Sequence, residues 1–387
     1  MLDREELTAW LRLQFCAGVG SASARQLLQS FGLPQNIFEQ SAASLGKVVS
    51  QRQAQSLLQS PEGLEQRVET TWKWLQAQPD RHRILTLGDA NYPAALLNIE
   101  DPPVLLYAIA APEVWQTQWL ARCADHCIAI VGSRNPTPQG AHNARQFARS
   151  LAQSGLTIVS GLALGVDGAA HEGALAVTDV SPCATIAVVG TGLDRVYPKQ
   201  HRDLAHQIAQ RGVLLSEYAL GTPPLTANFP KRNRIIAGLS RGTLVVEAAL
   251  RSGSLITARQ AVEQGKEIFA IPGSIHSTQA RGCHALIRQG AKLVESAHDI
   301  LEELQHTTPV GQAQNLPHPA TLADEQVIGS EHAALLQALG FDPVGLDDLQ
   351  ARTGLNTPML QAELMALELL GQVARLPGGL FQRLVQA

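Results

Sequence analysis

The amino-acid sequence predicts an α/β protein built on a largely parallel sheet, with a helical domain before the sheet and a smaller domain after it. Three observations predict this class. Residues 84–305 alternate short apolar runs with amphipathic segments, as do strands wound with helices on both faces of a sheet. Residues 1–80 show helical apolar spacing alone. A polar, proline-containing stretch at 306–330 reads as a linker before residues 331–387.

Length and composition limit the class of protein. The chain has 387 residues, more than one hydrophobic core usually organises, so several domains are expected. No run of about 18 apolar residues occurs, and the charged N-terminus lacks the apolar stretch of an export signal, which predicts a cytoplasmic protein without a membrane span. The five cysteines form no pair or Cys/His set at zinc spacing, so we expect neither disulfides nor a structural metal site.

The first 80 residues predict a small helical domain of the SAM-like or helix-hairpin-helix type. Gly18-Val19-Gly20 separates two short segments with helical spacing, and turn amides in such a motif can hold a nucleic-acid phosphate. The simpler interpretation is a tight glycine turn within a helical bundle. We favour it because the region has no cluster of cations.

In the central region the residues after each apolar run are of most interest, because ligands of parallel sheets bind beyond the carboxyl ends of the strands. The predicted strands are residues 127–131, 156–159, 185–189, 213–215, 244–246, 268–271 and 292–294. Small and polar residues follow them at Gly132-Ser133-Arg134, Ser160-Gly161-Leu162-Ala163, Gly190-Thr191-Gly192, Ser216-Glu217, Glu247 and Pro272-Gly273-Ser274. The sequence therefore predicts a ligand site at this edge of the sheet.

Positive charge is concentrated in residues 226–292. This window holds ten lysines and arginines against three acids, a balance of +7, whereas the whole chain carries −4. A single cationic groove gives this distribution, and binding through overall charge does not. At the mouth of an apolar helix in this window an aromatic ring precedes three cations and an amide, namely Phe229, Lys231, Arg232, Asn233 and Arg234.

Two further elements predict phosphate binding at the same edge. Arg251 offers a fork of donors, and Ser252-Gly253-Ser254 opens a helix whose first amides and positive dipole end are expected to face outward. In Gly132-Ser133-Arg134, after the first central strand, the Arg134 guanidinium offers a second fork of hydrogen-bond donors. Phe229 has two open interpretations: it stacks an unpaired base, or it packs the start of the following helix.

Sequence motifs for nucleotide binding, metal binding and catalysis are missing or incomplete. The chain has no Gly-x4-Gly-Lys-Ser/Thr loop, and Gly190-Thr191-Gly192 lacks the third glycine of a dinucleotide site, so no nucleotide cofactor is expected. Asp167 and His171 share a helical face, but no third ligand or nucleophile has a matching spacing. We interpret them as an acid in the first turn of a helix and a buried histidine. No catalytic residue and no metal are predicted.

Residues 331–387 predict a winged-helix-like domain, because three helical stretches precede two short strands around Pro377-Gly378-Gly379. The domain has three cations against six acids, a net charge of −3. A helix that reads DNA normally presents cations. We therefore favour a protein-contact or regulatory role for this domain over DNA binding.

Five motifs in order along the chain resemble the DNA processing protein A family (DprA, also called Smf). They are Gly132-Ser133-Arg134, Ser160 to Asp167 with His171, Phe229 to Ile236, Ser252 to Ala258, and Pro272-Gly273. The resemblance implies an extended Rossmann-like domain that binds single-stranded DNA without sequence preference, protects it and helps load RecA recombinase during natural transformation. It further implies a homodimer, with single-strand-binding protein as another partner.

Carried over by motif, the implied DNA-binding residues are Gly132, Ser133, Arg134, Phe229, Lys231, Arg232, Asn233, Arg234, Arg251, Ser252, Gly253 and Ser254. Two segments depart from the family pattern. Gly282-Cys283-His284 stands where the family often has Gly-Thr-Asn, and Ser181-Pro182-Cys183 lies in a loop extension before the third predicted strand.

The competing class is an enzyme. Gly242 to Glu247 resembles the Gly-Thr-x-x-Glu stretch of the cytokinin-activating phosphoribohydrolases, in which Glu247 would act on a nucleoside monophosphate. Leu239-Ser240-Arg241 replaces the glycines of that family's Pro-Gly-Gly-x-Gly-Thr loop, and the broad cationic window suits a polymer better than one phosphate. We therefore predict a DNA-binding protein and not an enzyme.

Overall fold

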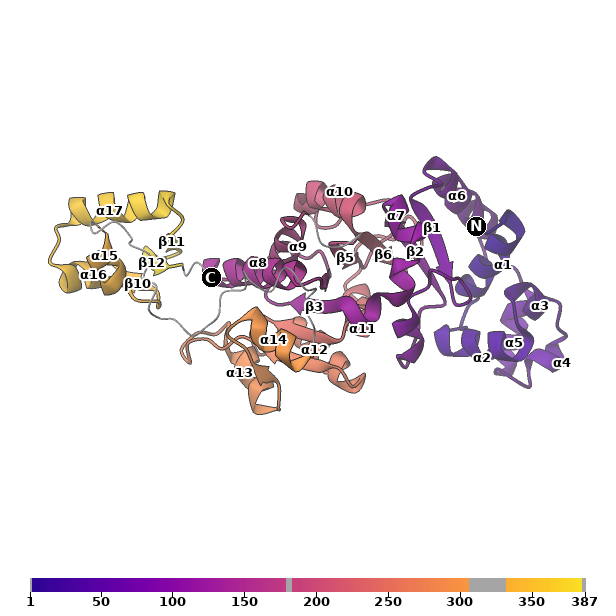
Figure 1. Cartoon of the computed structure of the whole chain (residues 1–387). Coiled ribbons are helices and arrows are strands. Elements are labelled where there is room, and N and C mark those ends of the chain that lie inside the picture. The colour runs from indigo at the N-terminus through magenta and orange to yellow at the C-terminus, as the bar shows by residue number, and fades with distance from the viewer. Residues whose placement is uncertain (1, 179–182, 306–331, 385–387) are drawn as a thin grey trace.

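The computed structural model describes residues 2–178, 183–305 and 332–384, and the predicted linker at 306–330 lies outside them. Within these residues a helical region, a nine-stranded sheet with helices on both faces, and a small C-terminal domain follow one another along the chain (Figure 1). A helix long and apolar enough to cross a membrane is not found among them.

The N-terminal region is a bundle of short helices. They are α1 (Arg4–Phe15), α2 (Ser21–Phe31), α3 (Pro34–Phe38), α4 (Ala42–Leu45), α5 (Gln51–Leu58) and α6 (Leu64–Ala77). Side chains set where two of them begin: Asp3 accepts a hydrogen bond from the Glu6 amide (2.7 Å) at α1, and Ser50 with Gln53 forms a capping box at α5. The buried leucines of the bundle share a core with Tyr107 of the sheet, so the bundle packs against the sheet.

The nine strands of the large sheet run in the order β1-β2-β6-β5-β4-β3-β7-β8-β9. Their bounds are β1 (His82–Thr86), β2 (Leu105–Ala110), β3 (Cys127–Val131), β4 (Thr157–Ser160), β5 (Thr185–Val188), β6 (Val213–Ser216), β7 (Gly242–Val245), β8 (Glu267–Ala270) and β9 (Lys292–Leu293). The predicted strands are β3 to β9, and their pairings with one another are all parallel. The sequence prediction missed β1 and β2, which extend the sheet in antiparallel pairs.

Helices cover both faces of the parallel strands, and alternate residues of β3 belong to two different hydrophobic cores. One core contains α8 (Pro138–Gln153) and α9 (Val166–Leu175), and the other contains α11 (Asn228–Leu239) and α12 (Ser254–Glu263). Shorter helices complete the domain: α7 (Pro112–Gln116), α10 (Arg202–Arg211), α13 (Arg281–Arg288), α14 (Ala297–Glu303), and the 3₁₀ helices η1 (Ala94–Asn98), η2 (Trp119–His126) and η3 (Lys199–His201). This burial on both faces fixes the strands as a rigid platform for the loops.

The strand order reverses between β3 and β7. The strands β4, β5 and β6 lie on one side of β3, and β7, β8 and β9 lie on the other. Loops that leave the carboxyl ends of β3 and β7 therefore diverge, and a crevice opens at this topological switch point. Gly132-Ser133-Arg134 follows β3 and Arg251-Ser252-Gly253 follows β7, so the fold brings these two predicted motifs to one place.

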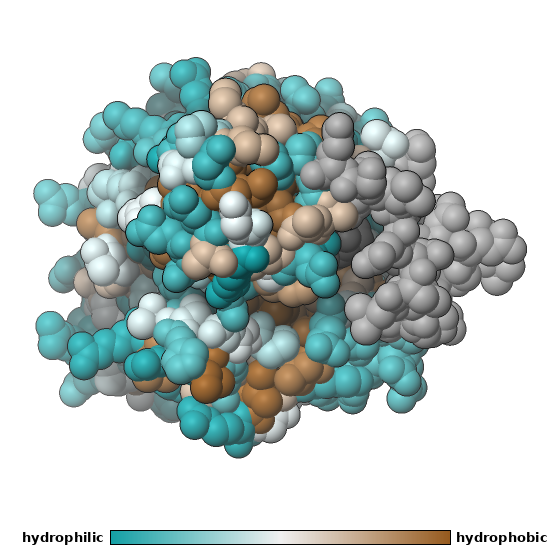
Figure 2. All heavy atoms as spheres, turned by 90° about the vertical axis from the view of Figure 1, so that its left-hand side faces the viewer, coloured by the Kyte–Doolittle hydropathy of each residue, from teal (hydrophilic) through white to brown (hydrophobic). Residues whose placement is uncertain are grey.

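The C-terminal domain has a winged-helix arrangement with its own core. Its elements are α15 (Ala333–Leu339), β10 (Val344–Gly345), α16 (Leu346–Thr353), α17 (Thr357–Leu369), β11 (Val373–Leu376) and β12 (Leu380–Arg383), and β10 joins the two predicted strands in one sheet. The helix α17 leaves Met359, Met365 and Leu369 between 52% and 80% exposed. Figure 2, which faces this side of the molecule, shows apolar surface among hydrophilic side chains.

Candidate nucleic-acid interface

A groove of about 650 Å³ lies at the switch point, and we call it the switch-point groove. Its walls come from the loop after β3, the loop after β7 and the first turns of α11 and α12. The predicted site residues that line it are Gly132, Ser133, Arg134, Phe229, Arg232, Asn233, Arg251, Ser252, Gly253 and Ser254. Lys231 and Arg234 do not line it.

The loop after β3 forms the first wall. Gly132 permits a close crossing, because a Cβ there would lie 2.7 Å from Cγ2 of Val166. Ser133 is buried, and its hydroxyl accepts a hydrogen bond from the backbone amide two residues further on (3.1 Å). Arg134 follows as an exposed side chain, with its guanidinium carbon 5.5 Å from the centroid of the Phe229 ring. The turn thus directs a cation to the mouth of the groove.

The loop after β7 forms the opposite wall, and it differs from the sequence expectation. The amide of Ser254 donates to the Ser252 hydroxyl (3.4 Å), and the amides of Leu255 and Ile256 donate to backbone carbonyls of the same turn (3.2 and 3.1 Å). The first amides of α12 are therefore engaged within the turn and do not face outward as expected. The polar groups on this wall are instead the Arg251 guanidinium, the Ser252 and Ser254 hydroxyls, which lie 2.7 Å apart, and the positive end of the helix dipole.

Arg232 of α11 lies in the floor of the groove and is only 4% exposed. Its Nε donates to Oδ1 of Asn233 (3.0 Å), and its Nη1 donates to the Val188 carbonyl. Gly161 makes room for it, since a Cβ at that position would overlap the guanidinium. Burial lowers the pKa of Arg232, and the nearby Asp167 carboxylate opposes this effect. Because a guanidinium stays protonated in proteins, Arg232 is a fixed positive charge beneath any bound anion.

Phe229 lies at the rim of the groove, between the Arg134 guanidinium and the ring of Tyr197, whose centroid is 5.7 Å away. The hydrophobic cores hold Ile235 and Ile236 of the same helix but not Phe229. This placement favours a ring presented to a ligand over a ring that packs the helix start, and base stacking stays a prediction. Sequence reasoning missed Tyr197, although it lies in Arg195-Val196-Tyr197-Pro198-Lys199, an aromatic between cations like Phe229.

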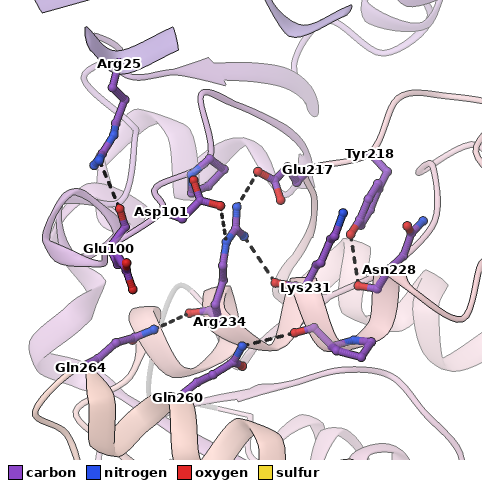
Figure 3. A network of polar contacts seen from close by, with 12 residues as sticks. Arg25, Glu100, Asp101, Glu217, Tyr218, Asn228, Lys231, Arg234, Gln260 and Gln264 are labelled. Atoms are coloured by element: carbon purple, nitrogen blue, oxygen red, sulfur yellow. Dashed lines mark hydrogen bonds and ion pairs between the residues drawn. The ribbon is translucent and has the colours of Figure 1, made fainter. Parts of the chain in front are cut away.

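Arg234 turns away from the groove into a polar network (Figure 3). Its Nη2 lies 2.7 Å from Oε1 of Glu217, and its Nε lies 3.4 Å from Oδ2 of Asp101. Burial raises the pKa of Glu217, and the guanidinium opposes that rise. The side chain of Lys231 is exposed. The three cations of α11 therefore have three different surroundings: solvent, the groove floor and an ion pair.

The remaining charge of the cationic window is dispersed as well. Lys292 pairs with Glu303 (Nζ to Oε2, 2.6 Å), and Arg241 donates to the Leu304 carbonyl. Of the ten cations in residues 226–292, only Arg232 and Arg251 line the groove, and Arg134 joins them from outside the window. The expectation that the window forms a single cationic groove is corrected accordingly, because most of its cations lie outside the groove lining.

The buried histidine predicted from the sequence is confirmed. His171 is fully buried in α9, and its Nδ1 lies 2.7 Å from Oγ1 of Thr185. That hydroxyl donates to the Ile158 carbonyl (2.6 Å), so the imidazole donates from Nδ1. Burial lowers the pKa of His171 to about 3, which keeps the ring neutral. Asp167, in the first turn of the same helix, accepts from the Ala163 amide (3.3 Å).

Glu247, the candidate catalytic acid of the competing class, lies outside the lining of the groove. Its carboxylate accepts hydrogen bonds from the amide (2.9 Å) and hydroxyl (2.6 Å) of Thr137. Thr137 is the N-cap of α8, and the carboxylate packs against Gly140 in the first turn of that helix. Glu247 therefore holds the start of α8, a positional task. In the described residues no group of three His, Cys, Asp or Glu side chains could hold a metal ion.

The fold and groove together define a Rossmann-like protein with arginines and an aromatic ring at the switch point of a doubly wound sheet. Comparison with known families identifies the family to which the chain belongs. The model for DNA recombination-mediator protein A matches residues 83–305, and the model for the DprA winged helix domain matches residues 317–379. The chain belongs to the DNA recombination-mediator protein A family, DprA/Smf, and the resemblance seen in the five motifs is confirmed.

Comparisons with individual proteins agree with this family assignment. The chain is 41% identical to Protein Smf of Escherichia coli over 332 residues, which cover 85% of this chain and 83% of that protein. The crystal structure of DNA processing protein A from Streptococcus pneumoniae is similar, with a TM-score of 0.61 and 36% identity over 78% of this chain and 98% of that one. A structure of DNA processing protein A from Helicobacter pylori, described for its unique single-stranded DNA binding mode, has a TM-score of 0.50 and 31% identity over 58% of this chain and 97% of that one.

Proposed function

We propose that the chain binds single-stranded DNA without strong sequence preference and that the strand lies in the switch-point groove. The observation that carries the proposal is the convergence of Arg134, Arg232, Arg251 and Phe229 on one groove from three separate segments. Guanidinium groups suit phosphate oxygens, and an exposed ring suits an unpaired base. The binding mode described for the Helicobacter pylori relative supports the same ligand class.

We further propose that the protein acts as a mediator in the cytoplasm and performs no chemistry itself. The bound strand would be protected and passed to RecA, which supplies ATP hydrolysis, with a homodimer as the working form and single-strand-binding protein as another partner. The engagement of Glu247 with Thr137 supports this reading over a phosphoribohydrolase. Release of free base from a nucleoside monophosphate, abolished by Glu247→Gln, would contradict it.

The test is a set of binding curves for a single-stranded oligonucleotide and its duplex at several salt concentrations. Affinity for the single strand should exceed that for the duplex and fall steeply with salt, because phosphate contacts release counterions. Arg134→Ala and Arg251→Ala should each weaken binding roughly tenfold and reduce the salt slope by about one.

The matched control is Arg149→Ala. Arg149 is an exposed arginine of α8 that does not line the groove, so this variant changes the net charge equally without touching the site. Its affinity should stay near that of the parent. Equal losses in all three arginine variants would indicate a diffuse charge effect and would place the strand elsewhere.

A further inference from the structure

Helix α17 of the C-terminal domain is apolar on two sides, and the domain covers only one of them. The covered side contributes leucines to the domain core, namely Leu360, Leu364 and Leu367. The opposite side carries exposed apolar residues at intervals of four, three and four positions, namely Pro358, Ala362, Met365 and Leu369. Residues with this spacing form one stripe along a helix. A helix that is apolar all round is normally buried, but the residues that the structure describes leave this stripe uncovered.

Two neighbouring residues widen the stripe into a patch. Met359 and Leu370 lie beside it, and both are more than half exposed, as are Met365 and Leu369. The patch is called the α17 face below, and it consists of Pro358, Met359, Ala362, Met365, Leu369 and Leu370. Soluble proteins rarely leave a contiguous apolar patch in water unless another molecule covers it. The α17 face therefore has the character of a contact surface.

Methionine is concentrated on the α17 face. The chain has only three methionines, and Met359 and Met365 are two of them. The core of the same domain is built from leucine, valine and phenylalanine instead. A methionine side chain is unbranched and polarisable, so it adapts to the contours of a partner and is over-represented on surfaces that bind varied sequences. This distribution favours a role in binding over a role in the packing of the domain.

The charges around the α17 face are acidic. Glu363 and Glu368 lie on either side of the stripe, and α17 carries no lysine or arginine. Nδ1 of His332 lies 3.8 Å from Oε2 of Glu363, whereas Glu368 is exposed. The arginines of the described domain are engaged with a backbone carbonyl or an aromatic ring, and they are Arg352, Arg375 and Arg383. An occupant with positive charge would therefore complement this face.

Charge separates the candidate occupants. A nucleic acid is disfavoured, because its phosphates would meet acids and no cation on α17. A second copy of the face would bring two sets of glutamates together with no cation on either helix. Residues 306–330 of the chain contain no lysine or arginine either. A helix with apolar residues at three- and four-residue spacing and cations beside them fits both the stripe and its acidic borders.

We propose that the α17 face is a docking surface for a protein partner that presents a basic amphipathic helix. Apolar side chains of the partner pack along the stripe, and its lysines or arginines lie beside Glu363 and Glu368. The helix α17 has 13 residues and is about 20 Å long, so the partner helix needs about three to four turns. This contact goes beyond the proposed function and does not depend on the switch-point groove.

The probes for the test are three labelled synthetic peptides of equal length, about four to five helical turns each. The first has leucines at three- and four-residue spacing and lysines at the other positions. The second replaces every lysine by glutamate. The third has the composition of the first in an order that places leucines on no common face. Fluorescence anisotropy on the full chain should show that the first peptide binds at least about tenfold more tightly than either of the others.

Methyl-labelled methionine locates the binding site. Met359 and Met365 give separate methyl signals in a nuclear magnetic resonance spectrum, and Met359→Leu and Met365→Leu assign them. The first peptide should shift or broaden both signals, and the second and third should leave them unchanged at the same concentration. This readout distinguishes docking on the α17 face from attraction of a cationic peptide to acids elsewhere on the chain.

Three variants test the apolar and the charged parts of the face. Met365→Gln and Leu369→Gln should each weaken the first peptide at least about tenfold, and both positions are exposed enough for the domain to fold. Glu368→Lys should weaken the first peptide and strengthen the second severalfold. The matched control is Val262→Gln, since Val262 is a 61% exposed apolar residue of α12 outside the groove lining. It should bind as the parent does, and thermal melting checks that each variant is folded.

Binding of the first peptide without any change in the two methionine signals would overturn the proposal, as would equal binding of the shuffled peptide. Dissociation of an oligomer of the parent by Met365→Gln, measured by sedimentation, would show that a second copy covers the face and would also overturn it. The folded Met365→Gln protein should keep the affinity of the parent for a dT strand. A loss of that affinity would place the strand on α17 in place of a basic helix.

Discussion

Helices α11 and α17 are similar in length, at 12 and 13 residues, and opposite in the chemistry they present. The first turns of α11 carry three cations and an aromatic ring, and this helix forms part of the switch-point groove. The helix α17 is the second helix of the helix-turn-helix within the C-terminal domain, the position from which such domains usually read DNA. It carries no cation, and Met359, Met365 and Leu369 are exposed on it.

The comparison shows that the fold of a domain does not decide which ligand it binds. A winged helix that binds DNA needs cations to offset phosphate charge, and a net charge of −3 opposes the approach of a polyanion. The sheet domain owes its predicted DNA binding to residues placed at one switch point, not to its topology alone. The protein therefore concentrates its proposed strand contacts in the sheet domain and leaves the winged helix with an apolar surface.

The largest effect we expect is on the free energy of unfolding, and it should differ between the cations of α11. Arg234→Ala removes one partner of an ion pair whose side chains are only 13% and 18% exposed, and it leaves Glu217 without its guanidinium. Breaking a buried pair in this way costs about 2–4 kcal/mol in the free energy of unfolding, with a discount for the residual exposure. Urea denaturation followed by circular dichroism measures it.

Lys231→Ala is the control for that experiment, because the Lys231 side chain on the same helix is exposed. Its free energy of unfolding should stay within about 0.5 kcal/mol of the parent. The folded Arg234→Ala protein should keep the strand affinity of the parent. If it loses affinity while its stability is unchanged, Arg234 belongs to the strand site after all.

A smaller effect is expected at Phe229, where a substitution should lower the affinity for single strands more than the stability of the fold. Phe229→Leu keeps an apolar side chain and removes the flat face, so single-strand affinity should fall by about 1–3 kcal/mol if a base stacks there. Stability should change by less than about 1.5 kcal/mol, because the ring lies outside the hydrophobic cores. Fluorescence anisotropy with a labelled strand measures the affinity. Unchanged affinity with a lowered melting temperature would support a packing role instead.

The sequence allowed prediction of the seven parallel strands, because all but the edge strand β9 are buried apolar runs and most are followed by a helix. The prediction missed β1 and β2 because antiparallel strands need no crossover helix, and the alternation of strand and helix was the signal used. The loop motifs after β3 and β7 were predictable from topology alone. The ion pairing of Arg234 was not predictable. Its partner Asp101 is 133 residues away in the chain, and spacing along the sequence does not reveal which charges meet.

The smallest effect should follow deletion of residues 331–387, which removes the winged helix. Every residue that lines the switch-point groove lies between positions 131 and 279, and the C-terminal domain has a separate core. At physiological salt, charges farther apart than about 8 Å are largely screened, so loss of a net charge of −3 should alter single-strand affinity by no more than roughly twofold. The truncated protein should still stimulate RecA filament formation.

Arg251→Ala in the truncated chain provides the control, because it must weaken binding as much as it does in the full chain. A tenfold loss on truncation would mean that α17 or its neighbours contact the strand despite their charge, and the contrast between the two helices would fail.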